Sequence, residues 1–103
     1  MSGAAEPSGE AEVTVRHDPA SMRFVVEVDG EITGFTEYIE RAGGESFDFV
    51  HTEIDPAFGG RGLGAALVSE ALAHTRGLGK KVIAHCPFVV AWLNKHPEFD
   101  TGV

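Results

Sequence analysis

The sequence predicts an α/β (α+β) fold: a mixed sheet with an N-terminal antiparallel meander of four strands, then a helix, a fifth strand parallel to the fourth, and a C-terminal helix. Three observations lead to this fold class. Residues 13–54 contain short runs of alternating apolar and polar side chains separated by turn residues, which is typical of strands. Residues 63–72 then place apolar side chains at helical spacing. A short apolar run follows at 82–84, and the order strand, helix, strand implies a right-handed crossover to a parallel strand.

The first half of the chain supplies the four strands of the meander. We expect them from Val13 to the break at Asp18-Pro19, and over residues 22–28, 31–40 and 46–54. Asp29-Gly30 lies between two strand-like runs and is the strongest hairpin signal in the chain. Gly34, inside the third strand, marks either a bulge or a close approach of two backbones.

The second half supplies two helices around the fifth strand. A helix is expected over residues 62–76, and Gly77-Leu78-Gly79 provides its left-handed stop. Pro87 suits the first position of the C-terminal helix, which ends at His96-Pro97. Five apolar residues of this helix are expected to pack on the sheet: Phe88, Val89, Ala91, Trp92 and Leu93.

Composition is that of one ordinary globular domain, since the chain has 103 residues and 43% of them are hydrophobic. Residues 1–12 are small, polar and acidic without apolar periodicity, which predicts a disordered leader before a single domain over 13–103. The one cysteine excludes an internal disulfide. No apolar run approaches the length of about 20 residues that spans a bilayer, and no signal-peptide core is present. We therefore expect a cytoplasmic protein, either a monomer or a weak homodimer.

Charge narrows the choice of partners. Sixteen acidic against eight basic residues give a formal net charge of −8. Such a balance disfavours nucleic acid or an anionic membrane as a partner. It fits either a solvated acidic surface or the attraction of a cationic acceptor such as an amine.

The stretch FGGRGLGAALV, residues 58–68, is the one most suggestive of ligand binding. Its four glycines cannot belong to a helix interior, where each costs about 1 kcal/mol relative to alanine. They lie between a strand and a helix, so free backbone N–H groups and the positive end of the helix dipole converge there. Such a point attracts a phosphate group. Arg61 is either a further phosphate ligand or a solvated loop residue.

Two common phosphate-binding motifs do not match this loop. A Walker loop ends in Gly-Lys-Ser/Thr, whereas Leu63-Gly64-Ala65 stands here. The dinucleotide-binding pattern G-x-G-x-x-G fails because Ala65 occupies the position of its third glycine. The loop therefore suits a diphosphate held by backbone amides.

The run 54–68, IDPAFGGRGLGAALV, resembles the acetyl-CoA diphosphate loop of the GNAT superfamily of N-acetyltransferases, whose pattern is Gln/Arg-x-x-Gly-x-Gly/Ala. Gly62 and Gly64 occupy the two glycine positions, and Gly59 stands where the family has Gln or Arg. The segments HTEIDP (51–56), CPFVVAWL (86–93) and HPEF (96–99) narrow the resemblance to small, single-domain GNAT-like proteins.

This resemblance implies a GNAT-like mixed sheet and acetyl-CoA as the co-substrate. It implies that amides around Glu53 and Ile54 contact the pantetheine arm in a gap between the fourth and fifth strands. It also implies that the loop holds the diphosphate, through Gly59, Gly60, Arg61, Gly62, Leu63, Gly64 and Ala65.

Three residues are candidates for the chemistry: Cys86, His51 and Glu53. Cys86 precedes a helix N-terminus, which favours a thiolate, so it is a nucleophile or a proton donor to the departing CoA thiolate, or else a small buried hydrophobe. His51 and Glu53 are two apart on a strand and share a face, so either one could accept a proton from an amine. Strand alternation turns His85 away from Cys86, and His96 is expected to contact the last carbonyls of its helix. No His, Cys and carboxylate set has metal-ligand spacing, so no metal is expected.

The leading hypothesis is an acetyl-CoA-dependent N-acetyltransferase acting on a small-molecule or protein amine, by direct attack or through an acetylated Cys86. A non-catalytic CoA-binding or partner-regulating module is the main alternative, because little sequence follows Phe99 to build a wall on the acceptor side. A structural α/β domain that uses its glycines only for packing is the third.

Overall fold

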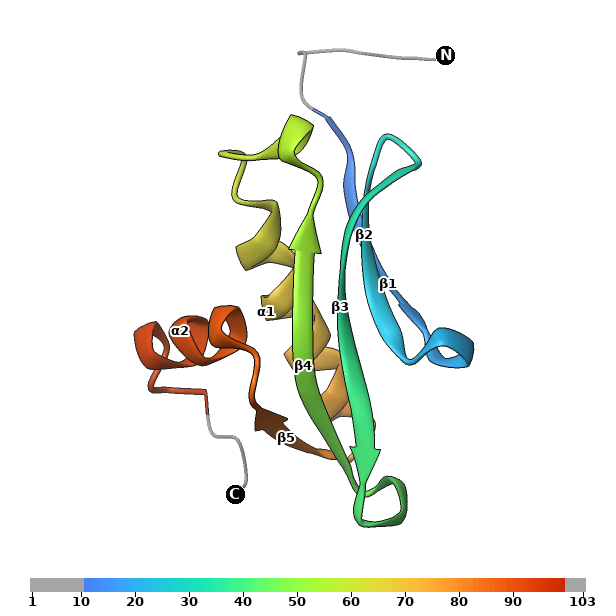
Figure 1. Ribbon diagram of the computed structural model, residues 1–103, viewed down its shortest axis with the longest axis vertical. Coiled ribbons are helices and arrows are strands. Elements are labelled where there is room, and N and C mark those ends of the chain that lie inside the picture. Colours follow the sequence, from blue (N-terminus) through green and yellow to red (C-terminus); the bar gives the residue numbers. More distant parts are fainter. Residues whose placement is uncertain (1–10, 100–103) are drawn as a thin grey trace.

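A computed structural model of the chain describes residues 11–99 and has the predicted order of elements (Figure 1). One sheet contains five strands in the order β1-β2-β3-β4-β5. The first four are antiparallel neighbours, and β5 runs parallel to β4. The strands are β1 Val13–Asp18, β2 Arg23–Val28, β3 Glu31–Arg41, β4 Ser46–Ile54 and β5 Lys81–Ala84. The helices are α1 Leu63–Gly77 and α2 Pro87–Lys95, with 3₁₀ turns at Pro19–Ser21, Ala42–Gly44 and Pro56–Phe58.

Backbone conformation explains the boundaries that differ from the predicted ones by a residue. Met22 has φ 53° and caps the preceding 3₁₀ turn, so β2 begins at Arg23. Gly62 has φ 73° and is the N-cap of α1, so this helix begins at Leu63. Asp29 and Gly30 both have positive φ, 52° and 86°, as a tight turn of type I′ requires, and the predicted hairpin is confirmed.

The core lies between the sheet and α1, which covers one face of the sheet behind the strands in Figure 1. Apolar side chains of β2, β3 and β4 meet the buried side of α1 there. The fully or nearly buried members include Phe24, Val26, Tyr38, Phe47, Phe49, Leu67, Val68 and Leu72. Leucine and valine at every third or fourth position of α1 thus produce the amphipathic helix that the sequence predicts.

A bulge in the β3–β4 ladder reverses the faces of β4 part-way along the strand. The register shifts between Glu37 and Tyr38, so that Tyr38 pairs with Phe49 and Glu37 with His51. Phe47 and Phe49 belong to the core on the α1 side. Beyond the bulge Thr52 lies on that side, because its Oγ1 is 2.9 Å from Oγ1 of the buried Thr36. His51 and Glu53 therefore lie on the opposite face, away from α1.

The C-terminal helix packs less completely than its composition predicts. Val89 is buried, but Phe88 is 44% exposed and Ala91 is exposed as well, so the prediction that both pack on the sheet is wrong. A helix of nine residues at the side of β4 and β5 buries only a narrow stripe. Its end is as predicted, because the ring of His96 lies 2.8 Å from the carbonyl oxygen of Trp92 and stacks on the indole.

The predicted leader, residues 1–12, lies almost wholly outside the described residues. Within them, Glu12 exchanges hydrogen bonds with Asp29: its amide donates to the Asp29 carboxylate at 3.0 Å and its carbonyl accepts from the Asp29 amide at 2.8 Å.

Candidate functional site

Strands β4 and β5 diverge early, and this opens one edge of β4. They pair only from Ser46 with Lys81 to Phe49 with Ala84. The amides of His85 and Cys86 then both donate to the carbonyl oxygen of Phe49 at 2.9 Å, which turns the chain away into α2. Residues 51–54 of β4 thus pair with β3 on one side and with no strand of residues 11–99 on the other. The gap between these strands, which the family resemblance implies near Glu53 and Ile54, thus begins on β4 directly after Phe49.

The glycine loop presents a run of backbone donors. Gly60 and Gly62 have φ of 80° and 73°, conformations that turn the chain sharply into α1. The first amide at the start of α1 that makes a backbone hydrogen bond is that of Ala66, which donates to the carbonyl oxygen of Gly62 at 3.1 Å. Six consecutive N–H groups, from residue 60 to residue 65, have no acceptor among the described residues. This is the arrangement that binds an anion at a helix N-terminus.

Two residues of the loop behave differently from the others. The amide of Gly59 already donates to the Pro56 carbonyl at 3.1 Å, so it is not free for a ligand. The guanidinium of Arg61 lies 5.0 Å from the centre of the Phe58 ring, a cation–π contact that holds it beside the loop.

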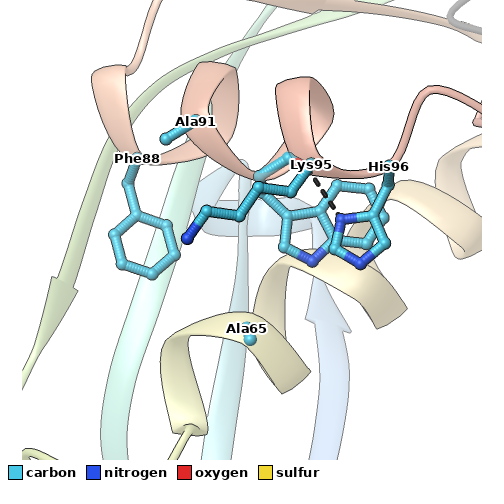
Figure 2. Close-up of a pocket in the computed structure, with 6 residues that line it drawn as sticks. Ala65, Phe88, Ala91, Lys95 and His96 are labelled. Atoms are coloured by element: carbon cyan, nitrogen blue, oxygen red, sulfur yellow. Dashed lines mark hydrogen bonds between the residues drawn. The ribbon is translucent and has the colours of Figure 1, made fainter.

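A small pocket of about 220 Å³ lies between the start of α1 and helix α2. Its lining residues are Ala65, Phe88, Ala91, Trp92, Lys95 and His96. Figure 2 shows Phe88 and Lys95 extending from α2 on the side that faces Ala65 in the first turn of α1. Gly64 permits this arrangement, because a Cβ at that position would overlap the Phe88 ring. The exposed Phe88 therefore serves as one wall of a pocket next to the free amides.

Cys86 lies at the point where β5 gives way to α2. It is the N-cap of α2, with Pro87 at the first helical position as predicted. The residue is only 4% exposed and belongs to the core on the α1 side. Its thiol donates a hydrogen bond of 3.4 Å to Thr52 Oγ1, from the free-edged half of β4. The thiol is thus buried, and it also borders the gap between β4 and β5.

His51 and Glu53 form a pair on the other face of β4. Nε2 of His51 is 2.8 Å from Oε2 of Glu53, which confirms that the two side chains share a face. Their side chains are 50% and 62% exposed. The structure does not bring this pair together with Cys86 on one face, because the bulge separates them across the sheet.

A third polar group, which the sequence analysis missed, lies where the strands part. The carboxylate of Asp48 is buried, with 1% of its side chain exposed. It accepts hydrogen bonds from Nδ1 of His85 at 2.8 and 2.9 Å and from the Arg41 guanidinium at 3.0 and 3.1 Å. One signal was available: Asp48 stands between two core phenylalanines, Phe47 and Phe49, and a carboxylate in such a place requires partners.

Among residues 11–99, no group of three or more His, Cys, Asp or Glu side chains is placed to hold a metal ion. The same residues contain no helix that is long and apolar enough to cross a membrane.

A five-stranded mixed sheet that opens between its parallel strands beside a donor-rich helix N-terminus defines a GNAT-like α/β fold. Comparison with known proteins agrees with this class. The family described as GCN5-related N-acetyl-transferase matches residues 23–102, and the chain belongs to this family.

One curated relative and one solved structure resemble the chain over part of their own length. A mycothiol acetyltransferase from Nocardia farcinica is 35% identical over 83 residues, which cover 81% of this chain and 27% of that protein. The structure of N-acetylglutamate synthase from Neisseria gonorrhoeae, complexed with coenzyme A and N-acetyl-glutamate, superposes with a TM-score of 0.60 at 14% identity. That superposition covers 91% of this chain and 30% of the synthase chain. The chain thus spans less than a third of the length of either protein.

Proposed function

We propose that this protein is an acetyl-CoA-dependent N-acetyltransferase that acetylates an amine of a small molecule or a protein. The observation that carries the proposal is the run of six unbonded amides, residues 60–65, at the start of α1 beside the free edge of β4. Membership of an acetyltransferase family and the coenzyme A named with the structural neighbour support it.

In this proposal the cofactor lies along one continuous surface. The amides of residues 60–65 hold the diphosphate, with Arg61 as an added positive charge, and Gly59 contributes shape but no donor. The pantetheine arm then follows the free edge of β4 past Ile54 and Glu53, where backbone groups can pair with its amides as a further strand would.

The proposed catalytic residues lie on the two opposite faces of β4 and have different roles. Cys86, on the α1 side, donates a proton to the departing CoA thiolate or takes the acetyl group itself. On the opposite face, the carboxylate of Glu53 attracts a cationic amine, and His51 or Glu53 accepts its proton.

Calorimetric titration with acetyl-CoA, followed by transfer assays with a panel of primary amines, tests the proposal. We expect binding at micromolar concentrations and transfer to at least one amine. Failure to bind acetyl-CoA or CoA at high micromolar concentration would refute it, and binding without transfer to any amine would favour the non-catalytic module.

Rapid-quench mass spectrometry separates the two possible routes. An acetyl group on Cys86 during turnover supports the acetyl-enzyme, whereas an unmodified thiol supports direct attack on the thioester. Cys86→Ala should abolish the first route and slow the second.

A further inference from the structure

Asp48 and His85 form a hydrogen-bonded carboxylate–imidazole pair that has no role in the reaction proposed above. Asp48 is buried on β4, and its carboxylate is anchored on a second side by Arg41 of β3. Because a carboxylate only accepts hydrogen bonds, the nitrogen of His85 that faces it, Nδ1, must carry the proton. In the neutral ring the other nitrogen, Nε2, then holds a free electron pair.

The remainder of the imidazole is accessible. The His85 side chain is 69% exposed, and no residue among 11–99 makes a hydrogen bond to its Nε2. A buried carboxylate that fixes the tautomer and orientation of an exposed imidazole is the arrangement by which enzymes prepare a histidine base.

The position of His85 coincides with the closed end of the gap between β4 and β5. Its amide bonds to Phe49, the last residue of β4 that pairs with β5. The free edge from Ile54 back to Val50 is about 13 Å long at the rise of a β-strand. An arm that starts at the glycine loop and follows this edge therefore ends beside His85 and Cys86.

The side chains of His85 and Cys86 lie on opposite faces of the sheet. Cys86 bonds to Thr52 on the α1 side, while His85 bonds to Asp48, which strand alternation between Phe47 and Phe49 places on the other side. His51 and Glu53 share that other side. An acceptor amine on that side would therefore have His85 beside it at the closed end of the gap, where the proposed arm ends.

We infer that His85, oriented by Asp48, takes the place of His51 and Glu53 as the catalytic base of the acetyl transfer; this rests on the proposed function. Nε2 takes one proton from the ammonium group of the acceptor and frees the nitrogen electron pair. The amine nitrogen then forms a bond to the acetyl carbon, and the carbon–sulfur bond breaks with its electron pair on sulfur. The second amine proton leaves the nitrogen and ends on sulfur as the CoA thiol, and the imidazolium of His85 returns its proton to water.

His51 provides the matched comparison, because it is also an exposed histidine beside a carboxylate on the same face. Its partner Glu53 is 62% exposed, whereas the carboxylate beside His85 is 1% exposed. An exposed carboxylate restrains a histidine ring less than a buried one, so His51 should be held less firmly than His85. His51→Gln and His85→Gln therefore separate the two candidate bases, because only the variant of the true base should lose the acidic limb of the pH profile.

The test compares acetyl transfer to the best primary amine of the panel by the two variants. We expect His85→Gln to lower kcat/KM for the amine by about 100-fold or more and to remove the acidic limb of its pH profile. Acetyl-CoA affinity, measured by calorimetry, should stay within about twofold of the unaltered protein, and His51→Gln should retain the acidic limb. Exogenous imidazole should restore part of the rate of His85→Ala.

A His85→Gln variant that keeps its acidic limb and its rate within about threefold would overturn the inference while leaving the proposed function intact. An unaltered protein that binds acetyl-CoA but acetylates no amine would overturn both. Nitrogen-15 NMR of the histidine rings gives a readout independent of activity: we expect neutral His85 to be protonated at Nδ1, and protonation at Nε2 instead would refute the base.

Discussion

Gly34 occupies a point where β3 and β4 come too close for any side chain. A Cβ at this position would lie 2.5 Å from Ile54 Cδ1 and 2.6 Å from the Glu53 carbonyl oxygen. The backbone oxygen cannot withdraw without displacing the free-edged half of β4. We expect Gly34→Ala to lower the free energy of unfolding by about 2 kcal/mol or more, measured by urea denaturation.

The matched control is Gly77→Ala at the end of α1. A Cβ there meets nothing within 4 Å, and the residue has ordinary helical conformation. Its free energy of unfolding should stay the same or rise by up to about 1 kcal/mol. Equal losses in the two variants would show that close packing at Gly34 is not the cause.

Single residues were predictable from the sequence where local chemistry decides their role. Asp29-Gly30 adopts its tight turn and Pro87 starts α2, because both depend on backbone preferences within a few residues. Asp48 was not predictable in the same way. Its partners Arg41 and His85 come from two other segments, and only the pairing of three strands brings them together.

At the scale of elements, α1 has a glycine with positive φ just beyond each end, and only the glycine at the N-terminal end belongs to the proposed binding loop. Gly62 precedes its first turn with φ 73°, and Gly79 follows its last turn with φ 79°; a Cβ at either would meet nothing within 4 Å. We expect Gly62→Asp to weaken acetyl-CoA binding at least tenfold, because it adds a negative charge where the diphosphate is proposed to dock. Calorimetry with acetyl-CoA measures this.

Gly79→Asp is the control for Gly62→Asp. It introduces the same residue at a similar φ but at the opposite end of the helix, where the dipole makes a negative charge unfavourable, so the free energy of unfolding of both variants should be measured alongside affinity. Acetyl-CoA affinity should therefore be unchanged in Gly79→Asp. Equal affinity in the two variants would place the diphosphate elsewhere.

The order and type of the elements follow from periodicity, but two features of the site do not. One is the bulge in the β3–β4 ladder, which moves His51 and Glu53 to the face opposite Phe49, although unbroken alternation would put all three on one face. The other is the length of β4 that β5 leaves unpaired. Both depend on register between strands, which no local pattern in either strand specifies.

At the scale of the whole molecule, one aromatic and imidazole cluster joins both sides of the core. His17 of β1 stacks on Phe24 of β2 with ring centres 4.3 Å apart, and its Nε2 is 2.7 Å from the Tyr38 hydroxyl of β3. His74 of α1 lies edge-on to His17 at 5.1 Å. This cluster should make stability depend on pH at both ends of the range.

The alkaline limit comes from Tyr38. Burial, and then the charges of Glu40 and Asp18, raise the pKa of its hydroxyl above the ordinary 10.0. The unfolded chain therefore ionises first, so this contribution to stability is complete below about pH 10 and is lost as the pH rises toward the folded pKa. We expect the free energy of unfolding to fall less steeply above pH 10 in Tyr38→Phe than in the unaltered protein.

The acid limit comes from His17. Burial is the main cause that lowers its pKa below 6.5, the neighbouring His74 lowers it further, and Asp18 opposes them. Below pH 6.5 the unfolded chain binds a proton that the folded ring resists, so this contribution is complete above pH 6.5 and is lost as the pH falls toward the folded pKa. Urea denaturation at about pH 7.5 and about pH 5.5 should show a smaller loss for His17→Gln than for the unaltered protein. Equal losses in His17→Gln and in the unaltered protein would mean that His17 does not set the acid limit.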